Sequence, residues 1–333
     1  MRMTDGAAHR WRETAADLAV LRGWRRGGRL PARLTTDAAP ESGQWRGFLD
    51  ALALWLGVAL CAAAVVCFIA ANWDAMGRFA RLGLMEMALV AATLAAWRLG
   101  IARPAGQAAL ALATVLLGGL LAVVGQTYQT GADTWELFAL WTALALPWTL
   151  AARNTAQWLG WMLLLDLAVG LRLGLRTAEL WLPQASVALP LGLLDLVLAA
   201  AWAGVAWRRP DLAGPLGARL LAVAAIGLLT WAAMLHIADA FRGEGFTMRA
   251  VAVAAWATAT LAVGAVALRG RRDVPVLAML MLGAIGVVTC ALGKALLEDH
   301  GAKGHLLLIA GTVVAQAALA VIALRRLARG ADA

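Results

Sequence analysis

Charged residues are scarce in this chain, and their scarcity excludes most soluble folds. Only 15% of the 333 residues are Asp, Glu, Lys or Arg, 62% are hydrophobic, and the mean hydropathy is +0.75. A soluble domain usually has about 25% charged residues. The chain therefore lacks the polar surface that a water-soluble globular protein of this length needs.

Cysteine is also rare, and the sequence lacks the common motifs of catalysis. Cys61, Cys67 and Cys290 all fall inside apolar stretches without Cys-x-x-Cys spacing, which excludes a disulfide framework. There is no P-loop, no dinucleotide-binding glycine pattern and no convincing nucleophile triad. We therefore expect no cofactor, and we rank an enzyme below other functions.

Ten long apolar stretches make up most of the sequence. A helix that rises 1.5 Å per residue needs about 20 apolar residues to cross the hydrocarbon core, where only helices and closed barrels satisfy the backbone. We predict an all-α integral membrane bundle of about ten transmembrane helices, at residues 48–71, 77–98, 106–125, 134–151, 154–171, 185–207, 217–237, 249–268, 274–293 and 303–324.

The two ends of the chain differ from the bundle. Residues 1–47 form a basic leader, in which Trp11, Leu18, Leu21 and Trp24 recur at roughly helical spacing among arginines. An amphipathic helix on anionic lipid and a solvated leader both fit this pattern. We expect the bundle to occupy 48–324 and a short basic tail to occupy 325–333. Without an early apolar region, the first span should stay as an anchor.

Basic residues distribute unevenly between the two sides of the predicted bundle. The net charge is +9, but Lys and Arg lie in short loops and tails and form no single patch, so we expect no nucleic-acid partner. Placing the N-terminus in the cytoplasm gives that side 21 of the 29 Lys and Arg residues and the other side 8. The positive-inside rule then predicts that both termini are cytoplasmic.

Two polar segments follow the first and the third predicted spans. One contains Asn72 and Asp74, and the other contains Gln126, Tyr128, Gln129 and Asp133, with Tyr128 as the only tyrosine. Both fall on the periplasmic side of the predicted topology, and neighbouring hairpins usually pack together, so we predict one shared polar mouth. A structural alternative exists for the residues that can cap helices, since Asp133 with Glu136, and Asn154 with Gln157, resemble capping boxes.

These segments also carry a family resemblance. Asn72-Trp73-Asp74, the run Gly125-Gln126-Thr127-Tyr128-Gln129 and the later Trp141 and Pro147-Trp148 resemble the bacterial membrane proteins of the domain of unknown function 2157 family, over about residues 44–151. The resemblance implies a multi-span bacterial membrane protein, and from the spans themselves we expect it in the inner membrane. It implies no activity and no catalytic or binding residues.

Three acidic residues lie well inside predicted spans: Glu86, Asp166 and Asp195. A charge at the bilayer centre costs about 2.5–3.5 kcal/mol on insertion scales, so such residues usually face the bundle interior. Each must stay protonated or find a partner on another helix. They either line a transport path or serve as structural hydrogen-bonding groups between helices.

A weaker constellation lies near two predicted periplasmic loops. His236, Asp239 and His300, with Glu298, Asp299 and His305 nearby, are residue types that bind divalent metals. Their spacing matches no metalloenzyme pattern, and charged loops between spans are usually only solvated. We therefore expect no metal, and these residues are weak candidates.

Two functions from different classes fit the sequence. The first is a carrier or permease-like protein for a small or amphiphilic solute, with the three acidic residues along its path. The second is a non-transporting accessory, scaffold or sensor protein that holds partners of the cell envelope. A carrier should have its buried carboxylates converging on one cavity, whereas an accessory protein should have them separately paired and no continuous cavity.

The topology makes the first testable prediction. A phosphatase fused at Ala333 should be inactive, and a cytoplasm-dependent fluorescent protein inserted at residues 126–133 should stay dark, because the basic residues retain both termini inside. Alkaline phosphatase activity of the C-terminal fusion, or fluorescence from the loop insertion, would contradict the predicted orientation.

Overall fold

The computed structural model describes residues 42–152, 154–176, 180, 182–208, 215–238, 246–269, 273–297 and 305–329. The chain divides into two units, residues 1–57 and 58–333, with the boundary inside the first described helix. Most of the predicted leader, the predicted tail after Arg329, and the metal candidates Asp239 and His300 lie outside the described residues.

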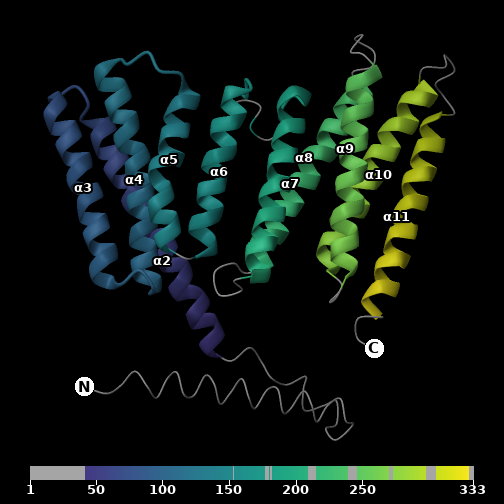
Figure 1. Cartoon of the computed structure of the whole chain (residues 1–333), viewed down its shortest axis with the longest axis horizontal. Helices are drawn as coiled ribbons and strands as arrows, with labels where there is room; N and C mark the ends of the chain where they lie inside the picture. Colours follow the sequence, from purple (N-terminus) through teal and green to yellow (C-terminus); the bar gives the residue numbers. More distant parts are fainter. Residues whose placement is uncertain are drawn as a thin grey trace, which may run out of the picture. The chain divides into compact units, whose positions relative to one another are not determined.

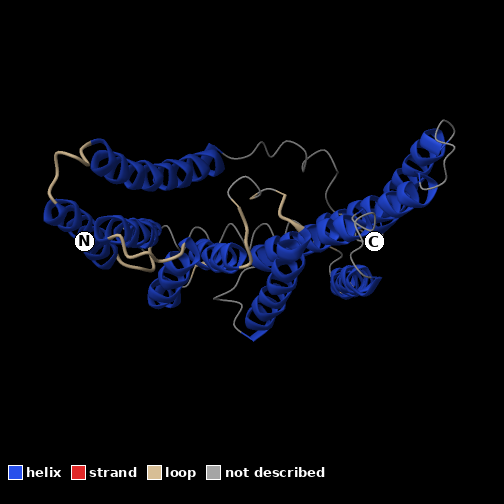
Figure 2. Cartoon of the chain, turned by 90° about the horizontal axis from the view of Figure 1, so that it is seen from above, coloured by secondary structure: helices blue, strands red, loops and turns tan. Residues whose placement is uncertain are grey.

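All regular structure in the described ranges is helical, which confirms the predicted fold class (Figures 1 and 2). Most boundaries fall within a few residues of those predicted, although α2 begins earlier, at Ser42, and α11 continues to Arg329. The helices are α2 (Ser42–Ala71), α3 (Arg78–Leu99), α4 (Pro104–Tyr128), α5 (Thr134–Ala152), α6 (Thr155–Arg172), α7 (Ala185–Arg208), α8 (Pro215–Ala238), α9 (Phe246–Leu268), α10 (Val274–Leu297) and α11 (His305–Arg329).

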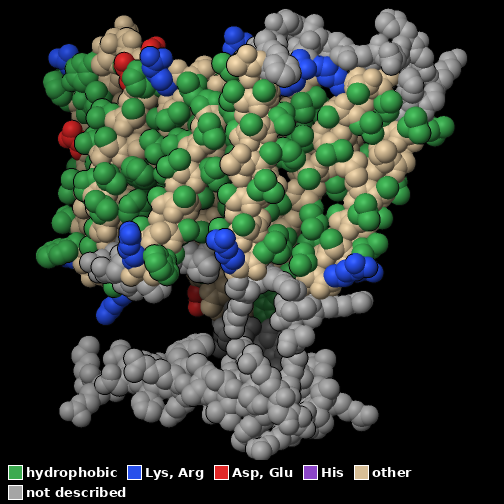
Figure 3. All heavy atoms as spheres, turned by 45° about the vertical axis from the view of Figure 1, so that its right-hand side comes forward, with side chains coloured by type: hydrophobic (Ala, Val, Ile, Leu, Met, Phe, Trp, Pro, Cys, Tyr) green, Lys and Arg blue, Asp and Glu red, His purple; other side chains and the backbone are tan. Residues whose placement is uncertain are grey.

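Nine of these ten helices are long and apolar enough to cross a membrane. The exception is α6, which has only 18 residues and includes Gln157, Asp166 and Arg172. Figure 3 shows hydrophobic side chains over the middle of the helices, with Lys and Arg side chains near their two ends. This distribution is typical of helices whose middles lie in hydrocarbon and whose ends reach the headgroups.

Contacts arrange the helices of residues 58–333 into two groups. In the first group α4 packs against α3 and α5, and α5 packs against α6; in the second, α8 packs against α7, α9 and α10, and α11 packs against α10 (Figure 1). The two groups meet mainly through α6, which contacts α7 and α8. The end of α2 joins the first group, because Ile69 is buried with Met85 of α3 and Leu116 of α4.

Buried tryptophans connect these helices by hydrogen bonds. The sequence places Trp55, Trp141, Trp231 and Trp256 deep within predicted spans, so their indole N–H groups are expected to need partners on neighbouring helices. Trp141 donates to the Thr114 carbonyl oxygen at 2.8 Å, and Trp256 donates to the Thr230 hydroxyl at 3.1 Å. Trp231 donates to the carbonyl oxygen of Pro183, just before α7. The expectation is confirmed for Trp141 and Trp256, while the partner of Trp231 lies outside the helices. Trp55, also predicted to be deep, is exposed.

One glycine sets the distance between α4 and α5. A Cβ atom at Gly118 would overlap the indole ring of Trp141, whereas a Cβ atom at Gly125, two turns later on α4, would meet nothing within 4 Å. The hydrogen bond to Thr114 fixes the Trp141 ring in place. Gly118 therefore allows the close approach of these two helices.

We predict opposite effects of two alanine substitutions on α4. Gly118→Ala should destabilise the purified protein by about 1–3 kcal/mol because it overpacks the contact with Trp141. Gly125→Ala is the matched control and should leave stability unchanged or raise it by up to about 1 kcal/mol through helix propensity. Thermal unfolding in detergent measures both, and equal behaviour of the two variants would contradict the packing.

Candidate functional site

The segment between α2 and α3 is organised by Trp73 and Arg81. The Arg81 guanidinium lies 3.9 Å from the centroid of the Trp73 ring and donates a hydrogen bond to the Trp73 carbonyl oxygen. The side chain of Asn72 donates to the Phe68 carbonyl oxygen of its own helix at 2.8 Å, and Asp74 is exposed. The Asn72 side chain thus bonds back to the last turn of α2 and ends that helix.

Sequence reasoning missed the role of Trp73 and Arg81. The two residues are eight positions apart across a turn, so no helical spacing connects them. An arginine at a span end is expected to extend outward to the headgroups. Arg81 instead folds back over the indole ring. The only signal in the sequence is the combination of a tryptophan and an arginine at facing ends of two neighbouring spans.

The second polar segment is largely part of α4. The helix continues to Tyr128, and Gln129 follows it with a φ of 44° in the left-handed region. Gln126, Tyr128 and Gln129 are all exposed. Gln126 and Tyr128 therefore lie on the last turn of α4, Gln129 caps it, and residues 130–133, including Asp133, form the loop.

The predicted caps are only partly formed. Asp133 accepts a hydrogen bond from the Trp135 indole at 3.4 Å, and its carbonyl oxygen accepts from the backbone N–H of Glu136. The cap of α6 is confirmed, because Asn154 Oδ1 accepts from the backbone N–H of Gln157 at 2.7 Å. The Gln157 side chain instead donates to the Thr114 hydroxyl of α4, also at 2.7 Å.

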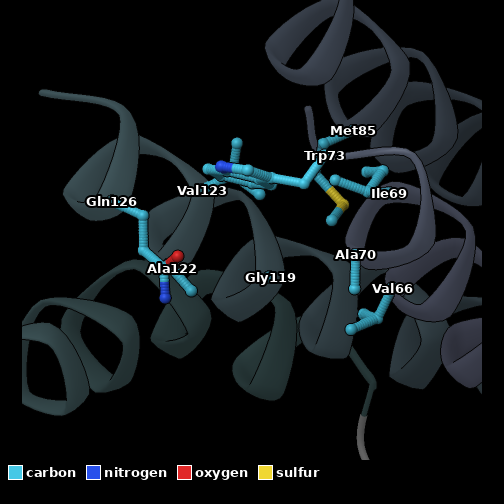
Figure 4. Close-up of a pocket in the computed structure, with 9 residues that line it drawn as sticks. All are labelled: Val66, Ile69, Ala70, Trp73, Met85, Gly119, Ala122, Val123 and Gln126. Carbon is cyan, nitrogen blue, oxygen red and sulfur yellow. The ribbon is translucent and has the colours of Figure 1, made fainter. Parts of the chain in front are cut away.

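Trp73 of the first polar segment and Gln126 of the second line one pocket, but Asn72 and Asp74 do not line it. A cavity of about 170 Å³ is lined by Trp73, Gln126, Met85, Val66 and Gly119, among others. In Figure 4 the Trp73 ring reaches across to α4, where Val123 and Gln126 lie. The lining is almost entirely apolar. The pocket therefore suits a small apolar group, with the Gln126 carboxamide as its main polar contact.

A larger cavity lies on the other side of Gln126. It measures about 710 Å³ and extends from Ala122 and Gln126 to Asp133 and Glu136 at the start of α5. We call the two cavities together the mouth pockets. Their acidic and amide groups suit hydrogen-bond donors or cations, so the mouth can bind polar groups beside an apolar one.

Two of the three intramembrane acids lie together. The carboxyl groups of Asp166 on α6 and Asp195 on α7 are within hydrogen-bonding range of each other. Asp195 is 3% exposed, and the Oδ1 atoms of both residues are buried without a hydrogen-bond partner. None of the four pockets described in this structure is lined by either residue.

Glu86 does not join this pair. It is exposed on α3, eight residues or about 12 Å from the start of the helix. Within the described ranges, no side chain forms an ion pair or hydrogen bond with it. The three acids therefore do not converge on one cavity, and Glu86 faces away from the bundle to which it belongs.

The metal candidates are only partly described. His236 is buried near the end of α8 and lines a cavity with Gln184, Ser186 and Pro190. Among the described residues, no group of three or more His, Cys, Asp or Glu side chains is arranged to hold a metal ion.

The fold and these sites define a polytopic α-helical membrane protein. Residues 24–158 match the family model described as "Predicted membrane protein (DUF2157)", which confirms the resemblance predicted from the sequence and extends it at both ends. This part of the chain carries the DUF2157 region, from before α2 to the first turn of α6. Neither the curated proteins nor the solved structures give a match.

The contrast between Glu86 and Asp195 makes a stability prediction. Glu86→Leu should change the unfolding free energy of the detergent-purified protein by less than about 0.5 kcal/mol, because no group of the described chain loses a partner. Asp195→Leu should destabilise it by about 1–3 kcal/mol, since the Asp166 carboxyl is then buried without its partner. Thermal unfolding of both variants tests this, and a larger loss in Glu86→Leu would reveal a partner for Glu86.

Proposed function

We propose that this protein is a non-transporting accessory protein that binds another membrane protein through one face of α3. The observation that carries the proposal is the exposure of Glu86 within a membrane-spanning helix. A carboxylate that faces lipid at this depth costs about 2.5–3.5 kcal/mol, whereas a carboxylate that faces a basic group on a neighbouring helix avoids that cost. The described part of the chain contains the acid and no partner for it.

The face around Glu86 has the pattern of a helix-packing surface. Phe79, Val90 and Trp97 are 72%, 55% and 71% exposed, and with Glu86 they follow one another at intervals of seven, four and seven residues. Residues at such intervals lie on one side of a helix. The opposite side, with Met85, Ala92 and Ala96, is buried against the bundle. We call the exposed side the α3 face.

The side chains of the α3 face indicate which kind of partner would bind it. Glu86 is the acidic group of an otherwise apolar strip, so the best complement is a transmembrane helix with one Lys, Arg or His at the same depth. A second copy of this chain offers the same acidic strip, in which two Glu86 side chains would meet. We therefore propose a different membrane protein as the occupant.

A carrier is less well supported by the same geometry. Its path requires the three acids around one cavity, but Glu86 is exposed, and the described pockets do not include Asp166 or Asp195. The mouth pockets lie at one end of the bundle and are not lined by any of the three. For the location, we propose the bacterial inner membrane with both termini in the cytoplasm, on the charge distribution given above.

Site-specific photocrosslinking in cells tests the proposal. A photoreactive amino acid at Val90, one turn from Glu86, should give one discrete adduct with another membrane protein. Glu86→Gln removes the negative charge and leaves the basic partner unpaired, which should weaken binding by more than about 1.4 kcal/mol. Because about 1.4 kcal/mol corresponds to a tenfold change in affinity, the yield of the adduct should fall at least tenfold. The same photoreactive residue at Leu163, exposed on α6, is the matched control and should give no such adduct.

The identity of the adduct decides between the alternatives. The crosslinked segment should contain a basic residue within the membrane, and exchanging the charges of this residue and Glu86 should restore the adduct. An adduct with a second copy of the chain, a yield that is independent of Glu86, or no adduct at Val90 would each overturn the proposed function.

A further inference from the structure

We infer that Asp166 and Asp195 form one proton-binding site that locks α6 to α7, and that loss of the proton loosens the junction between the two helix groups. This inference is independent of the α3 face, because it concerns different helices and requires no partner protein.

The first argument is the hydrogen-bond chemistry of the pair. An ionised carboxylate only accepts hydrogen bonds, so two carboxyl groups bond to each other only when one of them carries a proton. Asp195 is 97% buried, and its Oδ1 atom has no partner. The same holds for Oδ1 of Asp166. The proton between the two side chains is therefore the group that compensates their burial.

The second argument is the position of the pair in the contact between α6 and α7. Met162 lies one turn before Asp166 on α6, and Ala199 lies one turn after Asp195 on α7. Residues four apart share a helix face, and both neighbours are buried in one cluster with Trp202. The carboxyl groups thus occupy the packed faces of the two helices. Because α6 makes most of the contacts between the helix groups, the pair sits at their junction.

The third argument is the absence of a compensating cation in the interior of the neighbouring helices. The other titratable or charged residues of the helices packed against α6 and α7 lie near helix ends: Glu136 on α5, Arg172 on α6, Arg208 on α7, Arg219 and His236 on α8, and Arg249 on α9. In these described helices, no basic residue stands beside the pair to stabilise two negative charges.

Loss of the proton has a defined direction of effect. As the pH rises, the proton leaves to solvent, the hydrogen-bond donor disappears, and two carboxylates face each other in a low-dielectric contact. Pro190 lies five residues before Asp195 inside α7, where it removes a backbone hydrogen bond and provides a point at which the helix can bend. The junction should therefore be tight at low pH and loose at high pH.

Distance measurement on the full-length protein in lipid nanodiscs tests the inference. Spin labels at Leu140 on α5 and Leu261 on α9, both exposed, report across the junction after Cys61, Cys67 and Cys290 are replaced by Ala. Between about pH 5 and about pH 9, the range in which buried carboxyl groups titrate, the distance distribution should shift and broaden. In Asp195→Asn, whose amide donates to Asp166 at every pH, it should keep its low-pH form.

Two further measurements keep the test decisive. If Asp195→Asn does not fold, Asp166→Asn provides the same permanent donor from the other helix. At low pH, infrared spectroscopy should show a carbonyl band of protonated carboxyl groups in the unsubstituted protein, and the component that titrates with the pair should be lost in the double Asn variant, with any contribution of Glu86 unchanged. Two results would overturn the inference. One is a distance distribution of the unsubstituted protein that does not change with pH, and the other is a pH response of the Asn variants that equals that of the unsubstituted protein.

Discussion

A polar group that enters the bilayer without a partner is costly, and this cost determines most of the structure. The backbone satisfies itself in helices because hydrocarbon offers no hydrogen bonds. Four threonine hydroxyls follow the same rule: Thr93, Thr114, Thr142 and Thr149 each donate to the carbonyl oxygen four residues earlier. The hydroxyls of Thr260 and Thr289 are instead buried without a hydrogen-bond partner. Polar side chains within the spans therefore mostly strengthen the bundle.

Hydrogen bonds from indole and amide groups then determine which helices are neighbours. Trp161 of α6 donates to the Thr142 carbonyl oxygen of α5, and Gln157 reaches the Thr114 hydroxyl of α4. These bonds tie α6 to the first helix group even though it is the one described helix that is not long and apolar enough to count as a membrane span. The Gln157 amide donates a hydrogen bond to another helix, which an apolar side chain cannot do. This bond holds the short, polar helix α6 in the bundle.

Against this background the acidic residues stand out in two different ways. Asp166 and Asp195 satisfy each other, but only when one of them carries a proton. Glu86 has no partner in the described part of the chain and faces outward. The contact between α6 and α7 is therefore sensitive to protonation of the Asp166 and Asp195 pair. Glu86 still needs a partner, which another molecule can supply. Both follow from the same cost of polar groups in hydrocarbon.

The sequence predicts the helices well and the site only partly, for identifiable reasons. Apolar length alone places α3 and α9, and an asparagine followed by a glutamine three residues later predicts the cap of α6. The pairing of Asp166 with Asp195 was not predictable, since it depends on how α6 rotates against α7. The position of Arg81 over Trp73 is equally a tertiary effect. For Glu86, the sequence favoured an interior position, and only the packing of Met85 shows that Glu86 points outward.

The central claim is that Glu86 binds another membrane protein. The most direct test is the mass of the complex that contains this chain, isolated together with a patch of its native membrane. Native mass spectrometry of such patches should show the chain together with a different membrane protein, and Glu86→Gln should release the chain from that complex. If the unsubstituted protein is found alone, or only with copies of itself, the exposed carboxyl of Glu86 has no partner protein and the proposed function is wrong.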